Sequence, residues 1–253
     1  MRSHRLKILL IDTCGAIGSL ALADTARSPA VTASANLPGR SAAERLVPAI
    51  HSLAASSGIA LQELDAVAVV HGPGSFTGVR VGLSAAKGLC HALNLPLVAL
   101  SRLAVLASLG QKGAPHSSQL HGDGWENHVH ALLDAGRGEF YLGLYADAIC
   151  LREALVTRDQ LFAGESNKQQ PILIVCEPVV AQSLAALDPQ FVAEPTAADA
   201  LPLALARIQQ RAFDDPATID ANYLRRSDAE IFAKPIAASA PQPLPTRSAK
   251  PAR

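Results

Sequence analysis

The pattern of apolar and polar residues is most informative over residues 65–93. From Ala66 to Val70 every position is apolar, which predicts a strand over 65–70 that is buried on both faces. The following stretch, His71-Gly-Pro-Gly-Ser-Phe-Thr-Gly-Val-Arg80, holds three glycines and a proline and therefore predicts a tight turn. Apolar residues then recur at helical spacing as far as residue 93. A strand, a glycine loop and a helix in this order typically present backbone N–H groups to an anion.

The helix over 79–93 is apolar on most of its circumference. One stripe consists of Val79, Leu83, Ala86, Cys90 and Leu93, and a second of Gly82, Ala85, Leu89 and Ala92. A helix of this kind must be covered on two sides. Two hypotheses remain open: the helix is central to its own domain, or one stripe faces a partner subunit.

The rest of the first half alternates strands and helices. Strands are predicted over 6–11, 19–23, 31–35 and 97–100, and glycines at the first connection predict a hairpin. Ser41-Ala-Ala-Glu44 fits a capping box that begins a helix running to about residue 57. Leu46 and Ile50 lie on the apolar face of that helix, and a further helix is expected from about Arg102.

The second half repeats this mixture. Strands are predicted over 129–134, 139–145 and 172–176, with helices near 157–163, 179–187 and 197–211. Antiparallel strands followed by strands that alternate with helices are typical of an α/β fold. The polar composition of residues 111–127 predicts a loop. Residues 233–253 are rich in Pro and Ala and carry basic residues without acids, so we expect a disordered tail.

Composition narrows the class of protein. The 253 residues are 49% hydrophobic, 17% charged and only 4% aromatic, and the formal net charge is zero. A neutral chain argues against an autonomous nucleic-acid-binding protein. No apolar run approaches the length of a transmembrane helix. The four cysteines lack C-x-x-C spacing, which favours a reduced, cytoplasmic protein.

Common catalytic motifs do not fit the chain. The glycine loop matches neither a Walker A loop, a dinucleotide-binding G-x-G-x-x-G nor a nucleophile elbow, and H-E-x-x-H is absent from the sequence. The histidines at 116, 121, 128 and 130 lack the fixed spacing of a metal site. A small-molecule kinase is an alternative, with Asp134 as the candidate base, although Asp134 equally suits a turn.

Four motifs in order resemble one family. They are Ile11-Asp-Thr13, Gly72-Pro-Gly-Ser-Phe-Thr-Gly-Val-Arg80, Asp134-Ala-Gly-Arg-Gly-Glu-Phe-Tyr141 and Tyr223-Leu-Arg225. Together they are similar to the TsaB (YeaZ) family, bacterial accessory proteins of tRNA threonylcarbamoyladenosine synthesis. The resemblance spans residues 6–232.

The resemblance implies an actin-like, sugar-kinase-like (ASKHA) fold in which mixed sheets are flanked by helices. It divides the chain into an N-terminal lobe over 1–100, a smaller lobe over 101–232 and the tail over 233–253. Asp12 and Thr13 would be a vestige of a nucleotide-binding turn, with Arg137 nearby. Many relatives carry a histidine where this chain has Ala42 or Ala43, which favours a noncatalytic protein without a metal.

The resemblance also implies a function through partners. The chain would be a noncatalytic scaffold that binds a TsaD-like catalytic subunit, which modifies N6 of adenosine 37 in tRNAs reading codons that begin with A. A TsaE-like ATPase would join, tRNA would be held through the complex, and a homodimer would replace the heterodimer when the partner is absent. The expected interface is Leu46, Ile50, Phe76, Val79, Arg80, Gly82, Leu83, Ala86 and Lys87.

Cofactor binding is left open by the resemblance. We expect no cofactor in this chain alone, whereas ATP or ADP could bind a composite site shared with the partner, where Arg80 and Arg137 would supply positive charge. The alternative function is an ATP-dependent small-molecule kinase or a nucleotide-binding regulator of the same superfamily.

Overall fold

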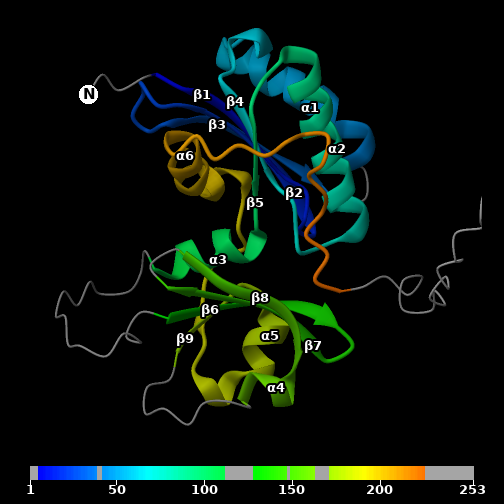
Figure 1. The fold of residues 1–253 in the computed structure, drawn as a ribbon, viewed down its shortest axis with the longest axis vertical. Helices are drawn as coiled ribbons and strands as arrows, with labels where there is room; N and C mark the ends of the chain where they lie inside the picture. Colours follow the sequence, from blue (N-terminus) through cyan, green and yellow to red (C-terminus); the bar gives the residue numbers. More distant parts are fainter. Residues whose placement is uncertain (1–4, 39–41, 112–127, 147–148, 163–170, 226–253) are drawn as a thin grey trace, which may run out of the picture.

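The computed structural model describes residues 5–38, 42–111, 128–146, 149–162 and 171–225. They form two lobes, each built on a five-stranded mixed sheet with helices on both faces (Figure 1). This arrangement confirms the predicted two-lobed α/β architecture. None of the helices that the structure describes combines the length and the apolarity needed to cross a bilayer.

The first sheet has the strand order β3-β2-β1-β4-β5. Its strands are β1 (Lys7–Asp12), β2 (Ile17–Asp24), β3 (Val31–Pro38), β4 (Ala66–Val70) and β5 (Leu97–Leu100). The predicted hairpin is confirmed, because β1 pairs antiparallel with β2, while β1, β4 and β5 run parallel. Every residue of β4 is buried, as its uninterrupted apolar sequence predicts.

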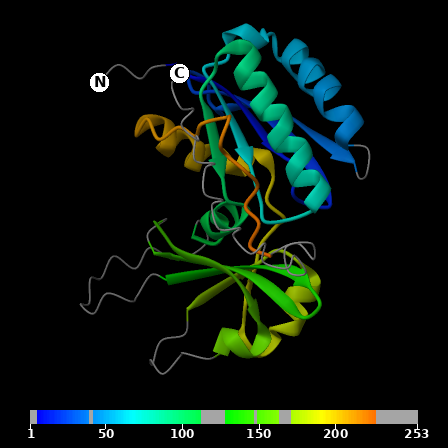
Figure 2. The same cartoon turned by 45° about the vertical axis from the view of Figure 1, so that its right-hand side comes forward.

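Helices cover both faces of the first sheet. Helices α1 (Ala42–Ser57) and α2 (Phe76–Leu93) lie side by side on one face, and the 3₁₀ helix η4 (Ala197–Ala200) and α6 (Leu201–Gln209) cover the other (Figure 2). The chain therefore returns to the first lobe after building the second. The resemblance instead implied a second lobe over 101–232. Helical periodicity could not refine this boundary, because it does not reveal which sheet a helix covers.

The second sheet has the strand order β10-β9-β6-β7-β8. Its strands are β6 (His128–Gly136), β7 (Glu139–Ala146), β8 (Ile149–Thr157), β9 (Ile172–Val175) and β10 (Gln190–Phe191). Helix α3 (Arg102–Gln111) covers the face toward the first lobe, and α4 (Arg158–Phe162) and α5 (Pro178–Ser183) cover the far face (Figure 1). Short 3₁₀ turns η2 (Leu61–Glu63) and η3 (Ala185–Leu187) complete the described elements.

The sequence missed strand β8. This strand lies at the edge of the sheet, and its first four residues are exposed. Charged residues interrupt it at Arg152 and Glu153, so it lacks the apolar alternation that indicates a half-buried strand. Its antiparallel pairing with β7 holds it in the extended conformation, and this pairing cannot be read from the sequence of β8.

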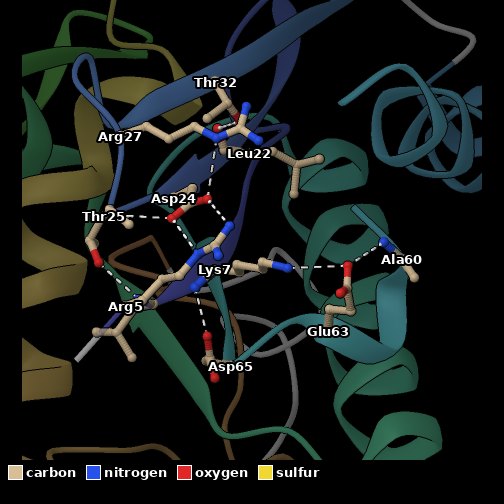
Figure 3. Close-up of polar contacts among 12 residues, drawn as sticks. Arg5, Lys7, Leu22, Asp24, Thr25, Arg27, Thr32, Ala60, Glu63 and Asp65 are labelled. Carbon is tan, nitrogen blue, oxygen red and sulfur yellow. Dashed lines mark hydrogen bonds and ion pairs between the residues drawn. The ribbon is translucent and has the colours of Figure 1, made fainter. Parts of the chain in front are cut away.

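A polar network lies where β1 begins and β2 ends (Figure 3). The fully buried Asp24, at the end of β2, accepts hydrogen bonds from Arg5 Nε at 3.2 Å and Arg5 Nη2 at 2.8 Å. Lys7 connects the start of β1 to Asp65 through its backbone N–H and to Glu63 through its ammonium group. These contacts fasten the first described residues to the body of the lobe.

Candidate functional site

Two hollows lie close together on the part of the surface that the structure describes. The larger, the interlobe cleft, has a volume of about 870 Å³ and lies between the turn after β1, the glycine loop and the hairpin β6–β7. The smaller, the helix groove, has a volume of about 560 Å³ and lies between α1 and α2. The helix groove is lined by Ala43, Leu46, Val47, Phe76, Thr77, Arg80, Val81, Ser84 and Ala85.

The glycine loop packs directly against the turn after β1. Thr13 Oγ1 donates to the carbonyl oxygen of Gly78 at 2.6 Å, and Ser75 N donates to the carbonyl oxygen of Cys14 at 2.9 Å. A Cβ at Gly78 would collide with the Thr13 carbonyl, and one at Gly74 would collide with Cys14. Close backbone approach thus explains these glycines. The glycines of this motif therefore allow the glycine loop to pack closely against the turn after β1, and these two segments form the floor of the cleft.

Asp12 is buried beneath this floor. Its Oδ1 accepts a hydrogen bond from Cys14 N at 2.8 Å, and its Oδ2 lies 4.0 Å from Arg102 Nε. Burial raises the pKa of Asp12, although the charge of Arg102 and the bond from Cys14 oppose this shift. Thr13 is also buried, and its hydroxyl donates a hydrogen bond to Gly78. The side chains of Asp12 and Thr13 thus both take part in hydrogen bonds within the chain.

An ion pair fills the space above the turn. Arg102, the first residue of α3, places Nη2 2.6 Å from Glu194 Oε1. A Cβ at Gly15 would meet both of these side chains, so the pair lies directly over the turn. Arg102 is buried, and its Nε has no hydrogen-bond partner among the described residues. Burial opposes its charge, yet Asp12 and Glu194 raise the pKa of Arg102 overall.

The second-lobe wall of the cleft is acidic. Glu177 accepts a hydrogen bond from Asp134 N at 2.5 Å, and burial raises the pKa of Glu177. Asp134 Oδ1 in turn accepts from Gly136 N at 2.8 Å, which is the turn-forming role weighed against that of a kinase base. Together with Glu194 they place three carboxyl groups among the described residues that line the cleft, and Asp12 lies buried beneath it.

This lining does not fit the phosphate chain of the nucleotide that the fold family implies. The Arg102–Glu194 pair lies directly over Gly15, and the carboxylates of Asp134, Glu177 and Glu194 would repel phosphate. The described cleft lining includes neither Arg80 nor Arg137. Arg80 lies at the helix groove, and Arg137 lies at the tip of the β6–β7 turn with a positive φ of 58°. The structure therefore does not bring the two predicted phosphate ligands together in the cleft.

The described residues also contain no group of three or more His, Cys, Asp or Glu side chains arranged to hold a metal ion. His128 and His130 lie in β6, and burial lowers the pKa of His130 to about 4. The histidines at 116 and 121 lie outside the described residues, as does Ser41 of the predicted capping box.

The predicted interface residues separate into two groups. Phe76 and Arg80 are exposed at the helix groove, Leu46 lies at its base, and the half-buried Lys87 donates to the carbonyl oxygen of Ile219 at 2.8 Å. The others are buried in the first lobe: Ile50, Val79, Gly82, Leu83 and Ala86. Val79, Leu83 and Ala86, of the first apolar stripe of α2, pack on the chain's own sheet, whereas Ala85 of the second stripe lines the helix groove. That one stripe of α2 faces a partner therefore stays a prediction.

The exposed side of α2 holds a stack that sequence reasoning missed. The guanidinium carbon of Arg80 lies 3.7 Å from the ring centre of Phe76 and 5.6 Å from that of Tyr223. Arg80 Nε donates to the Tyr223 hydroxyl at 2.7 Å. We call this group the Phe76–Arg80–Tyr223 stack. The Tyr-Leu-Arg motif, which contains Tyr223, is the sequence signal that could have indicated this stack, but the sequence alone gave the motif no role.

Residues 219–225, the C-terminal strap, connect the lobes. The strap runs from the side of α2 down to the second lobe (Figure 1). Asn222 Nδ2 donates to Glu153 Oε2 at 2.6 Å, and Glu153 also accepts from the Tyr145 hydroxyl. Arg225 Nη2 lies 2.6 Å from Glu139 Oε2 and donates to the Ala135 carbonyl oxygen at 2.9 Å. The strap thus holds the groove and the β6–β7 hairpin in one arrangement.

Comparison with known proteins identifies related chains. Residues 36–234 match the family model of TsaD, tRNA N6-adenosine threonylcarbamoyltransferase. The tRNA threonylcarbamoyladenosine biosynthesis protein TsaB of Bacillus subtilis is 35% identical over 136 residues, which cover 52% of this chain and 54% of that protein. TsaB of Haemophilus influenzae is 34% identical over 138 residues, covering 54% and 53%. The chain thus spans about half the length of the curated relatives it matches.

A solved structure extends the likeness to nearly the whole described chain. YeaZ from Pseudomonas aeruginosa superposes with a TM-score of 0.68 and 27% identity, covering 87% of this chain and 100% of that structure. The shared architecture of two mixed sheets flanked by helices confirms the predicted actin-like fold class.

Proposed function

Because the chain belongs to the TsaD family of tRNA N6-adenosine threonylcarbamoyltransferases, and within it to the TsaB/YeaZ proteins, we propose that it is a noncatalytic subunit of tRNA threonylcarbamoyladenosine synthesis. It would bind a TsaD-like catalytic subunit that modifies N6 of adenosine 37 in tRNAs reading codons that begin with A. A TsaE-like ATPase would join this complex, tRNA would be held through it, and the site of action would be the cytoplasm.

One observation carries this proposal: exposed apolar side chains gather at the helix groove, whereas an ion pair covers the turn after β1 in the interlobe cleft. Val47 and Phe76 are about half exposed beside the groove, at 50% and 51%. Exposed apolar residues that gather in a groove are typical of a protein-binding surface. The Arg102–Glu194 pair meanwhile lies over the turn where the fold family would hold phosphate. Binding is therefore better supported than catalysis.

The partner is proposed to contribute the equivalent helices. This chain matches the family model of the transferase over a range that includes α1 and α2, so a transferase subunit is expected to carry a helix pair of the same kind. Two related surfaces can pack about an approximate two-fold axis. A homodimer through the same groove is expected to form when the partner is absent.

Reconstitution tests the proposal. Purified chain, TsaD-like subunit and TsaE-like ATPase are mixed with tRNA, and threonylcarbamoyladenosine is measured with each protein omitted in turn. Val47→Glu, at the groove, is compared with Val179→Glu, an equally apolar site on the second lobe that is 69% exposed. We expect Val47→Glu to lower product formation at least about tenfold by weakening the complex, since it places a charge in an apolar contact.

Val179→Glu is expected to leave activity unchanged. Full activity without this chain, or equal loss in both variants, would overturn the proposal. Turnover of ATP by this chain alone would instead support the kinase alternative.

A nucleotide at a composite site stays a separate hypothesis. It predicts saturable ATP binding by the purified complex and none by either subunit, as measured by calorimetry. Absence of binding by the complex would remove it without affecting the scaffold role.

A further inference from the structure

The Phe76–Arg80–Tyr223 stack lies at the rim of the helix groove, where it orders three large side chains on the surface. Phe76 and Tyr223 stay 51% and 40% exposed although their ring centres are 5.6 Å apart. Exposed aromatic residues that flank an arginine match the composition of energetic hot spots in protein interfaces. The stack therefore joins α2 to the C-terminal strap and also has the composition of a protein-binding surface.

The stack fixes the orientation of the Arg80 guanidinium. The Phe76 ring covers it at 3.7 Å, and the Tyr223 hydroxyl accepts its Nε–H. The two terminal nitrogens of Arg80 have no hydrogen-bond partner among the described residues. A planar guanidinium held in this way presents two parallel donors, the geometry that binds a carboxylate through both oxygens.

The charges nearby favour a single carboxylate over a nucleic-acid backbone. Arg80 is the one charged residue among the described residues that line the helix groove. The adjacent interlobe cleft carries Asp134, Glu177 and Glu194, which would repel a phosphate chain. Binding a nucleic acid through its backbone needs several cations together. One arginine beside an apolar groove instead complements an amphipathic helix that carries one acidic residue.

We propose that Arg80 binds an aspartate or glutamate of the partner's helix pair, while apolar residues of the same helix fill the groove. This rests on the proposed function, since it defines the chemistry of that partner. Tyr223 is the positioning residue: its hydroxyl and ring hold Arg80 in the orientation that the carboxylate requires. The C-terminal strap, which also contacts the second lobe through Arg225, thereby contributes to partner binding.

The test measures the dissociation constant of the full chain with its purified TsaD-like subunit by calorimetry. Arg80→Glu should weaken binding by about 100-fold, because it replaces a paired charge with a repelling one. Arg80→Lys should weaken it by about tenfold, since lysine keeps the charge without the fork of donors. Arg158→Glu, an exposed arginine in α4 of the second lobe, is the matched control and should bind like the wild type.

Two further measurements make the assignment specific. Tyr223→Phe should weaken binding about threefold in the wild type and have no further effect in an Arg80→Ala background, whereas a merely structural role would act equally in both. Acidic residues of the partner's helix pair are changed to lysine one at a time, and one of them should restore binding of Arg80→Glu.

Each outcome has a distinct meaning. If the wild-type chain does not bind the subunit, the proposed function itself fails. If the wild type binds and Arg80→Glu binds equally well, only the role of Arg80 is overturned. The role is likewise overturned if Arg80→Glu leaves the heterodimer intact but lowers tRNA binding by the complex, because Arg80 would then contact RNA.

Discussion

Two buried aspartates at opposite ends of the β1–β2 pair behave in opposite ways. Asp24 pairs with Lys7 at the outer end of the ladder, and Asp12 pairs with Ser19 at the end toward the cleft. Both side chains are almost completely removed from solvent. The pKa of Asp24 is lowered, whereas the pKa of Asp12 is raised. Burial by itself therefore does not decide the state of a carboxyl group in this fold.

The difference lies in the number and closeness of donors. Asp24 receives two hydrogen bonds from Arg5 and one from Ala26 N at 3.0 Å, with Arg27 Nε 3.4 Å from Oδ2 (Figure 3). The hydrogen bond from Arg5 is the largest cause of the lowered pKa. Asp12 receives one backbone hydrogen bond and has Arg102 at 4.0 Å, so desolvation dominates. Asp24 is thus a carboxylate with several donors that stabilises the lobe, and Asp12 is a carboxyl group with few donors at the turn after β1.

The largest effect is expected from Asp24→Asn. Asparagine keeps the shape and the acceptor oxygen for Ala26 N but removes the charge that pairs with Arg5. Breaking such a pair should lower the melting temperature of the chain by about 5 °C at pH 7. Thermal unfolding followed by circular dichroism measures the shift, and Asp159→Asn on the exposed surface of α4 serves as the control.

The lowered pKa of Asp24 also predicts how the effect of Asp24→Asn on the melting temperature changes with pH. Because the folded pKa of Asp24 is lowered, its stabilising contribution is present above the unfolded value of about 3.9 and is lost as the pH falls through the folded pKa. The gap between wild type and Asp24→Asn should therefore shrink below about pH 4. A gap that is constant with pH would contradict the role of the charge.

A smaller effect of opposite sign is expected from Asp12→Asn. The raised pKa of Asp12 means that its contribution is present at low pH and is lost as the pH rises through the folded pKa. At pH 7 the substitution removes an unfavourable charge, so the melting temperature should stay level or rise by about 2 °C. The same scans measure this shift, which should vanish in acid. Destabilisation as large as that of Asp24→Asn would show that Asp12 and Arg102 form a strong pair.

Much of the fold was predictable because local patterns agree with burial. Strand β4, the β1–β2 hairpin and helix α2 follow from apolar periodicity and from glycine positions. Strand β8 was not predictable, because an exposed edge strand carries no apolar alternation. The return of η4 and α6 to the first sheet was also hidden, since a helix sequence does not identify the sheet that it covers.

The candidate site was predictable only in part. The glycine loop and the Tyr-Leu-Arg motif were found in the sequence, but their contacts join residues as far apart as Arg80 and Tyr223. The pairing of Arg102 with Glu194 likewise bridges 92 positions of the chain. No local spacing rule connects such residues, so their roles became visible only with the fold.

The sequence by itself determined the α/β elements, the family resemblance and the existence of a helix that is apolar on two sides. Only the tertiary structure decided which side is which: Val79 and Leu83 pack on the sheet, and Phe76 and Arg80 remain at the surface. The reason is physical. Helical periodicity records that a side chain is to be buried, but the covering atoms are supplied by strands and by a strap that are distant in sequence.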